Sequence, residues 1–467
     1  MIRYIDFVMS NLFLKLKSRL NAAPSSTDMT QGEPWKLLTS FALPVLFSQI
    51  FQQLYNTADS LIVGRTLGME ALAAVSSSGN LIFLLVSFFM GMSTGAGVVI
   101  ARYFGSGDRT RVRLAMHTNI VLAVTAGVLL SVIGVIATPA LLELMDTDPD
   151  VLPEAIEYFR FYFMGGLAVV MYNFCTGTMN ALGDSRRPLV YLICSSVINV
   201  LLDLLFVGVF RWGVWAAAFA TTISQTVSVV LCLSNLFSRK DEFRLSLKEL
   251  KFDGASLREI VRMGIPSGIQ NSVIGLANVI VQSNINSFGK VATAGYGSYA
   301  KLEGFAFLPI NSFTMAMTTF VGQNLGAGKT ERAKKGSRFG ITTAVIMSEL
   351  VGIVFFITAP LLVGLFSDDP DVIAAGVRQA RIESLFYCLL AFSHAVAAVC
   401  RGAGKAFVPM AVMFSVWCIL RVIYITVMMH FIHEIGLIFW AYPLTWGISS
   451  VIFAIYYRFC NWEGDKK

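Results

Sequence analysis

Long apolar windows recur from one end of the chain to the other. Each holds about 20 apolar residues, the length of helix that crosses about 30 Å of hydrocarbon at a rise of about 1.5 Å per residue. With 55% hydrophobic and 14% charged residues, the chain of 467 residues has the composition of a polytopic membrane protein. We expect an all-α fold with twelve membrane-spanning helices, at residues 38–64, 72–100, 114–138, 155–181, 189–210, 214–237, 263–288, 292–324, 340–365, 372–399, 408–431 and 435–459.

Basic residues predict which loops lie in the cytoplasm, because loops rich in Lys and Arg stay on that side of a membrane. Of the 36 Lys and Arg residues, 28 lie in seven segments: 1–37, 102–113, 183–188, 238–262, 325–338, 401–407 and 458–467. The segments between them are acidic, such as "LMDTDPDV" at 144–151, or nearly uncharged. This alternation predicts that both termini are cytoplasmic, and it accounts for the net charge of +7 without nucleic acid as a partner.

An internal repeat with an offset of 221 residues divides the chain into two halves. The offset places "GSGDRTR" (105–111) on "GAGKTER" (326–332), and "DPDV" (148–151) on a second "DPDV" (369–372). Each half then holds six predicted spans, and an even number of spans makes the halves parallel repeats that enter the membrane from the same side. Two six-helix bundles that face each other are typical of transporters with alternating access.

The predicted domain organisation follows from the repeat. It consists of an N-terminal segment 1–37, a six-helix bundle 38–237, a cytoplasmic linker 238–262, a second six-helix bundle 263–460 and a tail 461–467. Within the first segment, one helical face of residues 3–20 is apolar, which indicates an amphipathic helix on the inner leaflet. Alternatively, residues 1–28 are a dispensable extension and Met29 is a second start.

Motifs of catalysis and metal binding are absent from the sequence. It holds no HExxH, CxxC or GxSxG pattern, its four His residues are scattered, and His394 is interpreted as a hydrogen-bonded packing residue. The seven Cys residues lie in apolar segments or beside basic loops, so we expect reduced thiols. The loops "GSGD" and "GAGK" lack the spacing of a phosphate-binding loop, and their glycines are interpreted as helix ends. No catalytic residue, metal or cofactor is therefore predicted.

Two carboxylates in the first half lie inside predicted spans. Asp59 is the only acid of the first span and Asp203 the only acid of the fifth, and neither has a base one helical turn away. Asn199 precedes Asp203 by four residues and so shares its helix face. Counted from the outer ends of the spans, Asp59 is about five residues deep, and Asp203 and Thr221 are about seven, which is roughly 8–10 Å. The four side chains are therefore predicted to meet in the outer half of the membrane.

Burying these acids is energetically expensive, which favours a functional interpretation. An ionised Asp in a lipid-like setting costs roughly 2.5–3.5 kcal/mol, so the protonated form is favoured until water or a cation arrives. A carboxylate of this kind can exchange a proton for a cation. The alternative is that Asp59 and Asp203 only form hydrogen bonds between helices.

The second half does not repeat this set of side chains. The offset aligns Asp59 with Ile280 or Val281, and Asp203 with Tyr424. Instead, the second half has charged residues of both signs inside its predicted spans, from which we expect internal ion pairs: Lys301, Glu303, Arg378, Arg381, Glu383 and Arg421. Glu303 and Glu383 are secondary candidates for coupling to an ion.

The stretch "ALPVLFSQIFQQLYNTADSLIVGRTLGMEALAAV" (42–75), the "NVLLDLLFV" of the fifth span (199–207) and the twofold repeat of six spans resemble the multidrug and toxic compound extrusion (MATE) family over residues 30–460. The resemblance implies an antiporter of the bacterial inner membrane that exports organic cations or amphipathic toxic compounds in exchange for protons or sodium ions. It also implies an N-terminal cation site in proton-coupled members, which matches Asp59, Asn199, Asp203 and Thr221 here. Sodium-coupled members more often use acids on the seventh and tenth helices; the seventh span has none, while Glu383 in the tenth span leaves this mode open.

Two other functions stay open at this stage. A lipid-linked oligosaccharide flippase of the same superfamily would share the repeat and would need a cationic cavity, for which Arg160, Arg378, Arg381 and Arg421 are candidates. A membrane-embedded enzyme would need a reactive cluster that the sequence lacks. The expected partners are a small cationic or amphipathic substrate and membrane lipid, and we expect a monomer.

Overall fold

The computed structural model of the chain describes residues 26–144 and 152–462. The predicted amphipathic helix at 3–20, the acidic loop from residue 145 onward and most of the tail lie outside the described residues. In the first half, the elements are α2 (Pro34–Leu67), α3 (Met69–Ser106), α4 (Arg109–Leu144), α5 (Leu152–Met164), α6 (Gly166–Ala181), α7 (Arg186–Asp203), the π-helix η1 (Leu204–Val209) and α8 (Trp215–Ser238).

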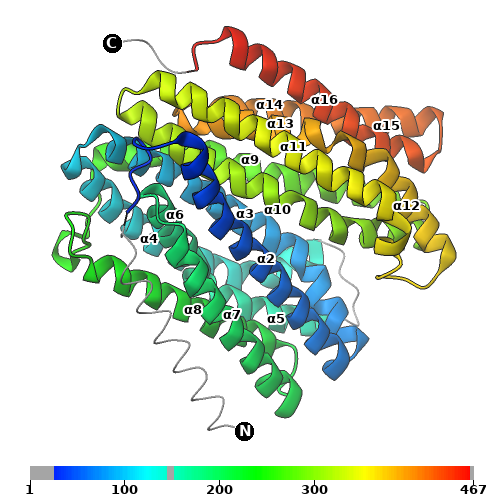
Figure 1. Cartoon of the computed structure of the whole chain (residues 1–467). Helices are drawn as coiled ribbons and strands as arrows, with labels where there is room; N and C mark the ends of the chain where they lie inside the picture. Colours follow the sequence, from blue (N-terminus) through cyan, green and yellow to red (C-terminus); the bar gives the residue numbers. More distant parts are fainter. Residues whose placement is uncertain (1–25, 145–151, 463–467) are drawn as a thin grey trace.

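The second half follows the same order of helices. Its elements are the 3-10 turn η2 (Leu247–Glu249) of the linker, then α9 (Gly254–Asn286), α10 (Lys290–Gly326), α11 (Thr330–Val363), α12 (Pro370–Glu383), the 3-10 turn η3 (Ser384–Phe386), α13 (Tyr387–Gly402), α14 (Phe407–Met413), the π-helix η4 (Phe414–Leu420), α15 (Arg421–Phe431) and α16 (Ile435–Phe459). Figure 1 shows the two halves as two helical bundles, one blue to green and the other mainly yellow to red. The predicted all-α architecture is confirmed.

The 221-residue repeat is visible in the positions where helices begin. Four helices of the first half start 221 residues before their counterparts: α3 at Met69 and α10 at Lys290, α4 at Arg109 and α11 at Thr330, α6 at Gly166 and α13 at Tyr387, and α7 at Arg186 and α14 at Phe407. Glycines with positive φ recur at the same offset, as Gly68 and Gly289, Gly107 and Gly328, and Gly183 and Gly404. Only glycine adopts this conformation without strain, so equivalent turns end equivalent helices.

All twelve predicted spans correspond to helices. Ten stretches among the described residues are long and apolar enough to cross a membrane. The other two predicted spans are α5 with α6, which are interrupted at Gly165, and α9. At Gly165 a side chain would overlap Thr222, which explains why glycine stands at the break. The 33 residues of α9 are sufficient in length, and polar residues such as Asn271 and Asn278 lower its mean hydropathy.

The first helix of each half also packs against the other half. The start of α2 enters the core of the second half, where Leu38, Phe41, Ala42 and Val45 are buried. The start of α9 runs along α3, where side chains at Gly91 and Gly95 would overlap the backbone of α9. These contacts lie toward the face that carries the basic segments 102–113, 183–188, 238–262, 325–338 and 401–407, which we call the basic side.

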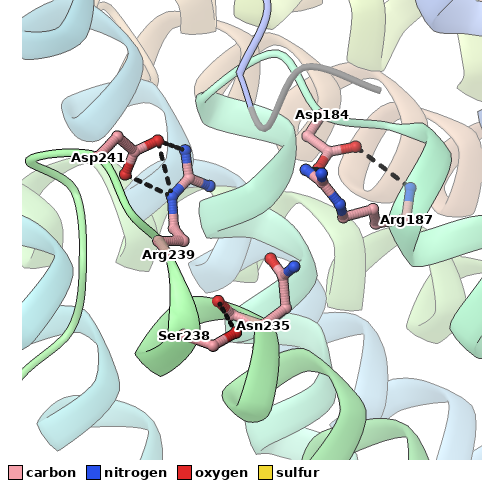
Figure 2. Close-up of polar contacts among 6 residues, drawn as sticks. All are labelled: Asp184, Arg187, Asn235, Ser238, Arg239 and Asp241. Atoms are coloured by element: carbon pink, nitrogen blue, oxygen red, sulfur yellow. Dashed lines mark hydrogen bonds and ion pairs between the residues drawn. The ribbon is translucent and has the colours of Figure 1, made fainter. Parts of the chain in front are cut away.

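The predicted linker 238–262 is an ordered part of the basic side. The backbone N–H of Ser246 donates to Nε2 of His117 at 3.0 Å, and that of Asp253 donates to Oγ1 of Thr118 at 3.0 Å. Arg239 and Asp241 form an ion pair with a shortest N–O distance of 2.6 Å (Figure 2). From Gly254 onward the predicted linker is already helix, because the Asp253 side chain accepts from the N–H of Ser256 at 2.8 Å and caps α9.

Candidate functional site

The four predicted side chains of the first half come from α2, α7 and α8. Asn199 donates through Nδ2 to Oγ1 of Thr221 at 3.4 Å, across the contact between α7 and α8. Asp203 lies one turn farther along α7, fully buried. Asp59 on α2 is close enough to Asp203 for the charges of the two carboxylates to interact. The structure therefore brings the predicted set together.

Within residues 26–144 and 152–462, no base neutralises the carboxylates of this group. Among the described residues, neither Oδ1 nor Oδ2 of Asp203 accepts a hydrogen bond, and the same holds for the buried Oδ1 of Asp59. The ion pairs recorded in the described part of the first half lie elsewhere, such as Asp184 with Arg187 on the basic side (Figure 2). Buried polar oxygens without partners are costly. The site therefore has the chemistry to take up a proton or a cation.

Sequence reasoning missed three further side chains at this site. Tyr55 of α2 and Tyr158 of α5 both interact electrostatically with Asp59 and Asp203. Gln225 of α8 lies next to Tyr55, and its Oε1 has no hydrogen-bond partner among the residues that the structure describes. Helical spacing could have found two of them, since Tyr55 precedes Asp59 by four residues and Gln225 follows Thr221 by four. Tyr158 lies on α5, where no helical spacing to a predicted site residue pointed to it.

A change in helix geometry begins directly after Asp203. The α7 helix ends at Asp203, and the next six residues, Leu204–Val209, form a π-helix. Short π-helical segments inside α-helices are frequent at functional sites, because the wider turn alters the direction of neighbouring side chains. In the second half, the π-helix Phe414–Leu420 ends directly before the buried Arg421.

The second half contains a separate buried cluster around Glu383. Its Oε1 accepts from Nε2 of Gln379 at 2.9 Å, while Oε2 has no hydrogen-bond partner among the described residues. Glu303 on α10 interacts electrostatically with Glu383, and both interact with Arg421. The structure therefore brings the two secondary candidates together.

Arg421 is held by hydrogen bonds and ring contacts. Its Nε and Nη2 donate to Oγ1 of Thr445 at 3.2 and 2.8 Å. Its guanidinium lies 4.2 Å from the ring centre of Tyr442. This cation–π contact and the two hydrogen bonds hold the buried charge without a carboxylate at ion-pair distance in the described residues.

The expectation of internal ion pairs in the second half is wrong. Lys301, Arg378 and Arg381 are exposed. Arg378 pairs instead with Glu434, and both side chains are about half exposed. The reason is helix phase: Gln379 and Glu383, four residues apart, face inward on α12, while Arg378 and Arg381, three residues apart, lie on its outer face.

His394 packs as predicted but without the expected hydrogen bond at one ring nitrogen. Its ring lies 5.9 Å from that of Phe307 and 5.3 Å from that of Trp417, and its Nε2 has no partner among the described residues. The described residues also contain no group of three His, Cys, Asp or Glu side chains that could hold a metal ion.

Comparison with known families decides the class of protein. The MatE family model matches residues 44–205 and residues 266–427, one match in each half. The chain belongs to the MATE family. It is therefore a multi-pass membrane transporter and not an enzyme, as the sequence predicted.

Relatives and solved structures agree with the MATE assignment. The chain is 29% identical to the "Probable multidrug resistance protein YoeA" of Bacillus subtilis, over 91% of this chain and 94% of the relative. It is 26% identical to the "Probable multidrug resistance protein NorM" of Thermotoga maritima, over 82% and 83%. A "FAD transporter" of Shewanella oneidensis is 25% identical over 72% and 75%. A solved multidrug resistance MATE transporter in an outward-facing conformation matches with a TM-score of 0.87, at 22% identity over 93% and 98%.

Proposed function

We propose that this MATE transporter is a secondary active antiporter that exports organic cations or amphipathic toxic compounds in exchange for protons. The names of its multidrug resistance relatives support the substrate class. The coupling ion is assigned from the residues of the first half, and a sodium ion is the competing choice. We further propose a bacterial inner-membrane location with both termini in the cytoplasm, and a monomer, because one chain supplies every side chain of the site.

One observation carries the proposal: Asp203 is fully buried, its carboxylate oxygens and the buried Oδ1 of Asp59 accept no hydrogen bond, and no base neutralises either acid among the described residues. Two like charges in a buried site favour a state in which at least one acid is protonated or a cation lies between them. A proton and a cationic substrate therefore compete for the same negative charge. This competition couples export of the substrate to entry of the proton.

The exchange then follows from which side of the membrane the site faces. When it faces outward, a proton from outside neutralises Asp59 and Asp203, which lowers the affinity for a cationic substrate and favours its release. When it faces inward, the proton leaves and substrate binds again. Each ligand shifts the equilibrium between the two states only through its different affinity for them.

The packing of the two halves supports alternating access between such states. On the basic side, α3 approaches α9 so closely that side chains at Gly91 and Gly95 would overlap backbone atoms of Ser267 and Gly264. The same holds between α3 and α10, where Gly105 lies against the backbone of Gln323. We interpret this arrangement as the state closed to the cytoplasm.

The test uses proteoliposomes with an imposed pH gradient and a fluorescent cationic substrate. Asp59→Asn and Asp203→Asn should each abolish substrate-driven proton movement, while Asp368→Asn, at an exposed acid of the second half, should leave it unchanged. Undiminished exchange of substrate for protons in both Asp59→Asn and Asp203→Asn would contradict the proposal. Collapsing the proton and sodium gradients separately decides between the ions, and movement of a lipid-linked oligosaccharide in place of the cation would favour the flippase.

A further inference from the structure

Residues 27–30, directly before the first helix, lie between the two halves on the basic side. We call them the strap. The N–H of Thr27 donates to the carbonyl of Leu182 at 3.0 Å, in the loop between α6 and α7 of the first half. The N–H of Met29 donates to Oε1 of Gln323 at 2.8 Å, near the end of α10 in the second half. Strap residues only two positions apart are thus bonded to different halves.

Gln323 is the centre of this connection. It is fully buried, and while its Oε1 accepts from Met29, its Nε2 donates to the carbonyl of Ala181 at 2.8 Å. One amide of the second half therefore joins the strap to the end of α6 in the first half. Both polar atoms of the side chain are used, which fixes its orientation.

The last turn of α10 and the loop that follows it also hold the strap. Nδ2 of Asn324 donates to the carbonyl of Met29 at 3.1 Å. Nζ of Lys329 donates to the carbonyl of Thr30 at 2.9 Å and to its hydroxyl at 3.2 Å. Met29 itself is 1% exposed and belongs to the hydrophobic core of the second half. The strap is therefore anchored by apolar burial as well as by hydrogen bonds.

We propose that the strap is a conformational lock that holds the basic side closed and must release one half before that side opens. The inference rests on the proposed alternating access. When the halves separate on the basic side, Ala181 and Leu182 move away from Gln323, and the strap cannot keep its bonds to both. Because the second half holds Met29 and Thr30, the bonds that break are those to Ala181 and Leu182.

The expected effect follows from the number of bonds. Each hydrogen bond between neutral groups changes the ratio of two conformations about two- to tenfold. Removing the bonds that Gln323 makes should therefore raise the population that is open on the basic side by at least fivefold. The strap adds no charge to the transport site, so its loss changes this population without changing which ion is coupled.

The experiment measures the distance between the two basic loops. Spin labels are placed at Thr110 and Lys335, which are exposed and belong to different halves, in a chain whose seven Cys residues are replaced by Ala. Gln323→Leu and deletion of residues 2–30 should each add a longer-distance population at least five times that of the parent. Gln31→Leu and deletion of residues 2–25 are the matched controls, because the Gln31 side chain is exposed and, among the described residues, bonds only to Asp28 of its own segment.

If both Gln323→Leu and the 2–30 deletion show the same distance distribution between the two spin labels as the parent, the proposal that residues 27–30 hold the basic side closed is wrong. The deletion ends before Pro34, where the first described helix α2 begins, so it keeps the test decisive if Gln323→Leu fails to fold, as shown by aggregation on gel filtration. The distance measurement needs no ion gradient. The two proposals can therefore fail separately. Undiminished exchange in Asp59→Asn would contradict the proposed coupling, whereas unchanged spin-label distances would contradict the proposed role of the strap.

Discussion

Asn199 and Thr221 join α7 to α8 through a single hydrogen bond of 3.4 Å. The bond uses the amide nitrogen of Asn199 and leaves its Oδ1 without a partner in the described part of the chain, on the same helix face as Asp203. Under the proposed function, we expect this Oδ1 atom to accept from a proton-bearing or cationic ligand. We therefore expect Thr221 to act through Asn199, as a positioning residue.

Thr221→Val should weaken the site, because the hydroxyl that orients Asn199 is lost while the side-chain volume is kept. We expect the apparent affinity for a cationic substrate to fall about three- to tenfold, the equivalent of one hydrogen bond. Thr221→Ser should behave like the parent. Substrate efflux at several concentrations checks the prediction, and equal affinities in the Val and Ser variants would contradict it.

Gly95→Val should prevent the close contact between α3 and α9. A side chain at Gly95 would overlap the backbone of Met263 and Gly264, and inserting volume into a packed contact costs about 1–3 kcal/mol. We expect transport to be lost and the basic side to stay open. Gly297→Val on α10 is the control, because a Cβ there meets no atom within 4 Å. Normal transport by Gly95→Val would show that the contact is dispensable.

Arg187→Met should destabilise the loop between α6 and α7. Arg187 donates to Oδ2 of Asp184 at 2.7 Å, and both side chains are less than a tenth exposed (Figure 2). Removing one member of a buried ion pair leaves an uncompensated charge and costs about 3–5 kcal/mol. The double variant Asp184→Leu/Arg187→Met should recover much of this loss. Thermal unfolding in detergent measures both, and a double variant less stable than the single one would contradict this account.

Asp253→Ala should destabilise the start of α9 by about 1 kcal/mol at neutral pH. The N–H and hydroxyl of Ser256 donate to the carboxylate of Asp253 and lower its pKa below the ordinary value of 3.8. A lowered folded-state pKa means that the contribution is complete above pH 3.8 and is lost as the pH falls below it. Asp253→Asn, which keeps the capping oxygen, should be nearly neutral. Unfolding temperatures at pH 7 and at the lowest pH the protein tolerates test this, and an Ala variant equal to the parent at pH 7 would refute it.

Helix phase explains where prediction from the sequence succeeded at the site and where it was wrong. Asp59, Asn199, Asp203 and Thr221 could be found because each is a rare polar group at a countable depth in an apolar span. For Arg378 and Arg381 the depth was equally countable, but the outer face of α12 placed them away from Glu383. Counting along a span gives depth and leaves open the direction in which a side chain points.

The sequence by itself determined the twelve helices, the twofold repeat and the placement of two acids in the first half, because span length, charge and repetition are properties of a one-dimensional pattern. Only the tertiary structure decided that α2 and α9 cross into the opposite halves, that Tyr55 and Tyr158 join the acids, and that residues 27–30 connect Leu182 to Gln323. These contacts join residues up to about 300 positions apart in the chain. They depend on which surfaces of the two bundles fit together, and no local pattern records that fit.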